Sequence, residues 1–169
     1  AFKFSVGIYR LVCSNGLVVA DEEFSDFKIK HKGYTFGELR NVVTQAVEDL
    51  PNRVEVMNQM QSTILTQDQK EKLALDAMLI RAGVEPGSDK AKEFTYDEET
   101  IVDILEPKRK EDEGNDLWAV FNVIQEKITQ GDFHAALTGA KVRKVRKIAS
   151  FEKDLKVNKQ LFKLATALV

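Results

Sequence analysis

The chain has 169 residues, of which 43% are hydrophobic and 31% are charged, and this composition is typical of one soluble globular domain. The longest apolar runs fall far short of the roughly 18 residues that a membrane span needs. A single cysteine excludes an internal disulfide and favours a reducing cytoplasm. The chain starts at Ala1 without Met, so we expect that flanking segments have been removed.

The net charge of −2 is unevenly distributed. Residues 1–60 carry seven basic and eight acidic side chains, residues 61–115 carry eight and fourteen, and residues 116–169 carry ten and five. The three segments therefore have net charges of −1, −6 and +5. Such asymmetry indicates either a polarised surface that meets nucleic acid or an acidic partner, or segments that neutralise each other within the fold.

The N-terminal part has the pattern of antiparallel strands. Residues 2–12 are rich in aromatic and β-branched residues and predict a strand. Asn15-Gly16 favours a two-residue hairpin turn, after which residues 17–19 return as a second strand. Residues 24–32 alternate and predict a half-buried third strand, whose outer face is basic.

From residue 35 onward the apolar spacing becomes helical. Pro51 should break or kink the first helix, and the capping-box pattern at Thr66 with Gly83 beyond Arg81 marks a later one. The predicted helices cover residues 35–50, 66–81, 95–105, 115–128 and a long basic stretch at 140–168. Residues 107–114 are too charged to pack and predict an exposed loop.

These patterns together predict an α+β protein. We expect an N-terminal antiparallel β-meander of three strands or more, followed by five or six α-helices. Residues 1–169 should form a single domain. Within it, residues 1–34 supply the meander, 35–114 the helices and acidic loops, and 115–169 the basic helical segment.

Enzymatic chemistry finds little support in the sequence. Cys13 and His31 need not be neighbours in a meander, and Cys13 fits a small buried hydrophobe better than a nucleophile. The acidic run from Asp97 to Asp103 is better explained as charge at a helix N-terminus than as a metal site. No phosphate-binding glycine loop or serine-nucleophile motif occurs. We therefore expect a non-enzyme without metal or cofactor.

The basic elements point to nucleic acid instead. Residues 141–150 hold five cations and no anion, which suits phosphate neutralisation. On the predicted helix, Lys141, Lys144 and Lys147 share a face, and Val142, Val145, Ile148 and Phe151 form an apolar stripe. The strand near His31 mixes cations with aromatic rings, as single-stranded nucleic acid requires. The candidate binding residues are Lys28, Lys30, His31, Lys32, Tyr34, Lys141, Arg143, Lys144, Arg146 and Lys147.

The stretches RLVCSNGLVV, KHKG and NDLWAVFNVIQEKI carry a resemblance that spans residues 9–168. The sequence resembles the phage/plasmid-like family called domain of unknown function 932, which shares the Cys-Ser/Thr-Asn-Gly-Leu turn and the Asn-x-Leu-Trp helix. In overall plan and charge layout it also resembles the Drc-type phage cofactors. That second resemblance implies single-stranded-DNA binding, self-association and assistance to a phage RNA polymerase.

The sequence therefore favours a non-catalytic phage protein that binds single-stranded DNA without sequence preference and acts in transcription or replication. It would be a homo-oligomer in the host cytoplasm, with the phage RNA polymerase as a further partner and no membrane. Two alternatives remain open: a regulator whose basic helix docks on an acidic partner, and a single-strand annealing recombination protein.

Overall fold

The computed structural model describes residues 2–4, 27–29, 36–48, 50–94, 96–131, 133–135 and 142–169. Its helices are α1 (Phe36–Glu48), α2 (Leu50–Ser62), α3 (Gln67–Ala82), α4 (Asp89–Lys92), α5 (Glu98–Leu105), the 3₁₀ turn η1 (Lys110–Asp112), α6 (Leu117–Gln130) and α7 (Phe151–Thr166). Its strands are β1 (Phe2–Phe4), β2 (Phe27–Ile29), β3 (His134–Ala135) and β4 (Arg143–Lys144).

The predicted α+β class is wrong, because the described part of the chain is mostly helical. Its strands form only two short antiparallel pairs, β1 with β2 and β3 with β4. Phe2 lies opposite Ile29, so the first predicted strand pairs directly with the third. The hairpin turn at Asn15-Gly16 and the middle strand lie outside the described residues. Such short pairs cannot bury a core of their own.

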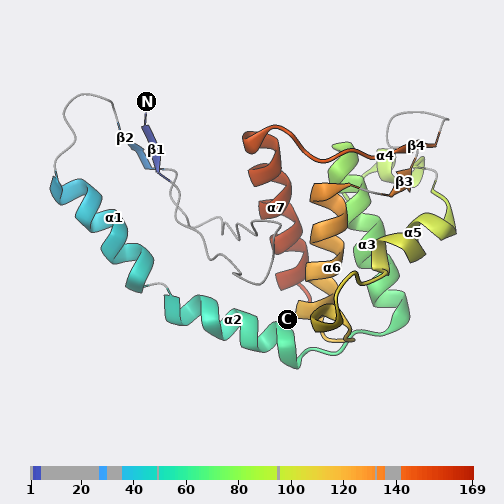
Figure 1. Cartoon of the computed structure of the whole chain (residues 1–169), viewed down its shortest axis with the longest axis horizontal. Coiled ribbons are helices and arrows are strands. Elements are labelled where there is room, and N and C mark those ends of the chain that lie inside the picture. Colours follow the sequence, from blue (N-terminus) through green and yellow to red (C-terminus); the bar gives the residue numbers. More distant parts are fainter. Residues whose placement is uncertain are drawn as a thin grey trace.

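The core is built by α3, α5, α6, α7 and the C-terminal part of α2, whose Met60 is fully buried, and α1 extends from α2 as an arm (Figure 1). Helix α6 is the central element, because twelve of its fourteen residues are buried. Its apolar side chains pack with Met60, Met78, Ile104 and Leu161 from the four neighbouring helices α2, α3, α5 and α7. No helix in the described ranges is long and apolar enough to cross a bilayer.

The ends of α3 confirm the helix limits that the sequence predicts. The Thr66 hydroxyl accepts a hydrogen bond from the Gln69 N–H at 3.3 Å, and the Gln69 side chain accepts one from the Thr66 N–H at 2.8 Å. This reciprocal pair is the predicted capping box. Gly83 then ends the helix in the left-handed conformation, with φ of 78°.

Two other helices begin close to their predicted starts. Asp97 caps α5 by accepting from the Glu99 N–H at 3.1 Å, and Glu98 and Glu99 lie in its first turn, which confirms the predicted helix N-terminal charge for these three residues. Asp103 instead lies in the last turn of α5, with its carboxylate 2.7 Å from the Lys127 ammonium. Asp116, rather than Asn115, caps α6 through the Ala119 N–H at 3.0 Å. Asn115 instead accepts a hydrogen bond from Lys70 at 2.5 Å, which explains the one-residue shift.

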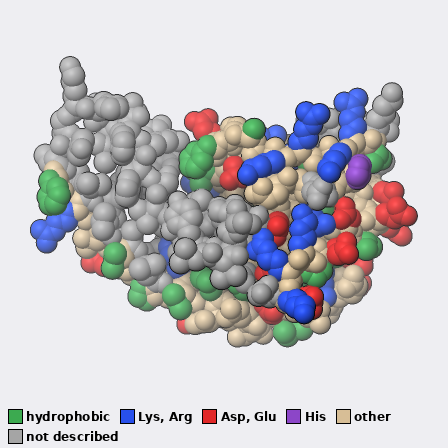
Figure 2. Space-filling view, in the orientation of Figure 1, with side chains coloured by type: hydrophobic (Ala, Val, Ile, Leu, Met, Phe, Trp, Pro, Cys, Tyr) green, Lys and Arg blue, Asp and Glu red, His purple; other side chains and the backbone are tan. Residues whose placement is uncertain are grey.

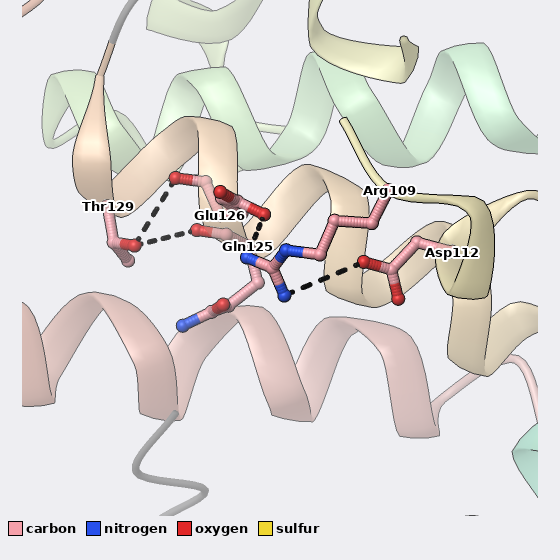
Figure 3. A network of polar contacts seen from close by, with 5 residues as sticks. All are labelled: Arg109, Asp112, Gln125, Glu126 and Thr129. Atoms are coloured by element: carbon pink, nitrogen blue, oxygen red, sulfur yellow. Dashed lines mark hydrogen bonds and ion pairs between the residues drawn. The ribbon is translucent and has the colours of Figure 1, made fainter. Parts of the chain in front are cut away.

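Most described residues of the segment 107–114 are exposed, as the sequence predicts, but Asp112 is buried and Arg109 is half-buried, so the segment is not too charged to pack. The Arg109 guanidinium lies 2.7 Å from the Glu126 carboxylate and 3.9 Å from that of Asp112, and Asp112 is buried (Figure 3). Arg109 thus bridges two carboxylates, so Asp112 can be buried beside α6 with a cation close to it. The charge density of the segment indicated solvent exposure but could not reveal this local contact.

The predicted basic helix over residues 140–168 is also wrong in its first half. Residues 143–144 form β4, residues 145–150 are not helical, and α7 begins only at Phe151. The Ser150 hydroxyl caps α7 by accepting from the Lys153 N–H at 3.3 Å. Helical spacing of apolar residues thus continues through a segment that is not a helix.

Candidate nucleic-acid interface

The candidate interface is the basic segment, residues 142–150, between β4 and α7. Figure 1 shows the chain leaving β4 and crossing one end of the helix bundle, above the C-terminal ends of α3 and α6, to reach the start of α7. This end carries the partial negative charge of two helix dipoles, which favours cations. Figure 2 shows Lys and Arg side chains gathered over this part of the visible face.

Two buried side chains anchor the basic segment to the bundle. Val145 and Ile148 are both buried in the core. Their backbone N–H groups donate to the carbonyl oxygens of Phe133 at 2.8 Å and Thr129 at 2.9 Å. Each anchor therefore combines apolar burial with a hydrogen bond to the chain at the end of α6.

Arg81 and Gly131 fix the stretch between the anchors. The Arg81 guanidinium donates a hydrogen bond to the Arg146 carbonyl oxygen at 2.7 Å. Gly131 has φ of 79°, and a Cβ atom there would lie 2.5 Å from the Val145 carbonyl oxygen. Only glycine lets the two backbones approach so closely. The basic segment therefore has a defined path before any ligand binds.

Four cations project from this fixed backbone: Arg143, Lys144, Arg146 and Lys147 are all exposed. Burial raises the pKa of the Asp154 carboxyl, and Lys147 and Arg81 partly oppose that rise. Burial also lowers the pKa of Arg81, against the effect of Asp154. One carboxylate therefore faces two cations, and the surface there remains positively charged on balance.

The structure describes five of the ten predicted binding residues. Four lie together in the basic segment, but on an extended chain and not on a shared helical face. Lys28 lies on β2 opposite Lys3, and Figure 1 shows β2 on the other side of the molecule from β4. The other five lie outside the described residues: Lys30, His31, Lys32, Tyr34 and Lys141.

Sequence reasoning missed Arg81 and Gly131, which position the basic segment. A glycine just past a helix end is a recognisable signal, so Gly131 could have been identified as a helix terminus. Nothing in the sequence indicates that the backbone of residues 145–147 passes over it. Arg81 lies 65 positions from its acceptor in the chain, and no local pattern reveals that contact.

A cleft of about 450 Å³ lies at the opposite end of the bundle. Val102, Leu105 and Val120 line it together with the charged Lys70, Glu106 and Asp112. Asp112 also lies near Arg109, which pairs with Glu126 and holds η1 on α6. Charges of both signs therefore meet at this cleft, and it does not single out an anionic or a cationic ligand.

The chain is similar to two curated proteins of Escherichia coli strain K12. It is 30% identical to the UPF0380 protein YafZ and 27% identical to the UPF0380 protein YfjQ, with the whole chain covered in both alignments. The chain spans 58% of the length of each of these relatives. No solved structure matches it. A family model matches residues 1–162, and the chain therefore belongs to the family described as Domain of unknown function (DUF932).

Proposed function

We propose that this chain is a non-catalytic domain that binds single-stranded DNA through its phosphate backbone, without sequence preference. The observation that carries the proposal is the basic segment, in which Val145 and Ile148 are buried while four cations point outward from a fixed backbone. A surface segment that only needs solubility usually mixes charges of both signs. Four neighbouring cations on one exposed strip instead favour an anionic ligand.

The length of the strip suits a short run of phosphates. Residues 143–147 span at most about 14 Å if fully extended, which is roughly the rise of four stacked nucleotides in one strand. Hydrogen bonds with Phe133, Thr129 and Arg81 fix the strip beforehand. Binding therefore loses little backbone entropy, and this favours affinity.

The wider role of the protein is proposed on the likeness to Drc-type cofactors, which remains a prediction. On that likeness the protein would self-associate and assist a phage RNA polymerase in transcription or replication. The matched relatives are longer than this chain. These partnerships are therefore proposed for the whole protein, while the basic segment supplies the contact with DNA.

The test is fluorescence anisotropy with a labelled single-stranded oligonucleotide and two charge-matched variants. One variant replaces Arg143, Lys144, Arg146 and Lys147 by Ala. The other replaces Lys70, Lys72, Lys108 and Lys110, which belong to α3 and to the segment around η1 at the opposite end of the bundle (Figure 1).

We expect the first variant to bind at least about tenfold more weakly and the second to bind nearly as the parent does, apart from long-range charge effects. Thermal melting checks that both remain folded. Equal binding by the first variant and the parent would show that the basic segment is a docking face for an acidic protein partner and would refute the proposal.

A further inference from the structure

Phe151 is an exposed aromatic side chain at the end of the basic segment. It is the first residue of α7, and its side chain is 63% exposed. Sequence spacing placed Phe151 in the same apolar stripe as Val145 and Ile148, but only the latter two enter the core. Val145 and Ile148 therefore anchor the basic segment to the core, whereas the exposed Phe151 ring contributes little to the fold.

The backbone that carries this ring is fixed on both sides. Ser150 caps α7 immediately before it, and Leu155, one helical turn later, is buried. Because Ile148 anchors the chain three residues earlier, Phe151 lies close to the cations in the chain and does not belong to a free loop. Residues 147 and 151 are at most about 14 Å apart along the chain, so a strand that contacts Lys147 can reach the ring.

Exposed charges of both signs flank Phe151 in the sequence, with Lys147 before it and Glu152 and Lys153 directly after it. A single strand whose phosphates contact these cations brings its bases within reach of the ring. Unpaired bases expose their faces for stacking on aromatic rings, whereas bases within a duplex do not.

Resting on the proposed function, we infer that Phe151 is a base-stacking residue that makes the basic segment select single-stranded over double-stranded nucleic acid. The cations supply attraction to any phosphate chain, and the ring supplies a contact that only an unpaired base can make. Phe151 would therefore determine specificity, while Arg143, Lys144, Arg146 and Lys147 determine most of the salt-dependent affinity.

The test compares two oligomers of equal length, about 16 nucleotides: oligothymidylate, and an abasic deoxyribose-phosphate chain that has the phosphates without the bases. Phe151→Ala should weaken binding of oligothymidylate by about 5- to 150-fold and leave binding of the abasic chain unchanged. Val142→Ala is the matched control, because Val142 is 59% exposed at the other end of the segment and has no ring. It should leave both affinities nearly unchanged.

Phe151→Trp gives an independent readout. Trp118, the single tryptophan of the chain, is buried, so a tryptophan at position 151 would report on the surface. Its fluorescence should be quenched by oligothymidylate but not by the abasic chain, with affinity retained.

Three results would overturn the inference alone. The first is oligothymidylate binding that Phe151→Ala does not weaken, and the second is an equal loss of affinity for both oligomers in that variant. The third is a loss of oligothymidylate affinity in Val142→Ala as large as that in Phe151→Ala, which would indicate general apolar contact in place of stacking. If the parent binds neither oligomer, the proposed function is wrong and the inference falls with it.

Discussion

Gly131 should control the path of the basic segment, and Gly131→Ala tests this directly. The backbone at this position has φ of 79° and ψ of −140°, close to a region that only glycine populates, so an alanine should cost about 1–3 kcal/mol in backbone strain. Its Cβ would also lie 2.5 Å from the Val145 carbonyl oxygen and 2.8 Å from the Arg146 carbonyl carbon. Both are backbone atoms, so the clash can be relieved only if the basic segment moves away. This displacement should lower the free energy of unfolding by roughly another 1–3 kcal/mol.

The combined loss of about 2–6 kcal/mol in the free energy of unfolding is large for a domain of this size and is measured by urea denaturation. Gly83→Ala is the matched control, because Gly83 also has a positive φ, of 78°, but no atom lies within 4 Å of the place that an alanine Cβ would take there. It should lose only about 1–2 kcal/mol and bind DNA as the parent does, whereas Gly131→Ala should also bind more weakly. Equal stability losses in the two variants would refute the proposed close approach of the backbones.

Three further predictions concern stability and the remaining sites. Because burial raises the pKa of Asp154, the folded state binds that proton more tightly than the unfolded state, so the ionised group destabilises the fold above the raised pKa. Asp154→Asn should therefore raise the melting temperature at neutral pH, and the gain should shrink as pH falls through that pKa; a gain independent of pH would contradict this. Arg109→Ala removes the cation that lies 2.7 Å from the partly buried Glu126 carboxylate and should lower the free energy of unfolding in urea denaturation by about 3–5 kcal/mol; a loss below about 1 kcal/mol would mean a solvated pair. Cys13→Ser should leave DNA binding intact in anisotropy, and loss of an activity in a folded variant would favour catalysis.

Helix ends were the most predictable part of the fold. The capping box at Thr66 and the glycine at position 83 depend on side chains within a few residues of each helix end, so sequence order is enough to locate them. The start of α6 was displaced by one residue because Asn115 bonds to Lys70, which is distant in the chain. Fold class failed for the same reason, since strand pairing also depends on distant partners.

The candidate site was predictable in composition but not in shape. Charge counting located the cations of residues 143–147, because a run without anions is visible in the sequence. Their conformation was mispredicted, because Val145 and Ile148 keep a three-residue spacing that is typical of a helix. Hydrogen bonds to Phe133 and Thr129 hold a non-helical chain there instead. The absence of a Cβ atom at Gly131 lets this chain pass close to the backbone of that residue. Tertiary contacts overrode a local pattern.

The salt dependence of single-stranded-DNA binding tests the central claim most directly. Each phosphate contact on a single strand should contribute about −0.7 to the slope of log K against log salt. The four cations of the basic segment therefore predict a contribution of up to about −2.8, which should disappear when all four are replaced by Ala. Binding to DNA whose strength is unchanged between about 50 and 200 mM salt, or whose slope is the same in the parent and the variant, would contradict phosphate recognition by this segment.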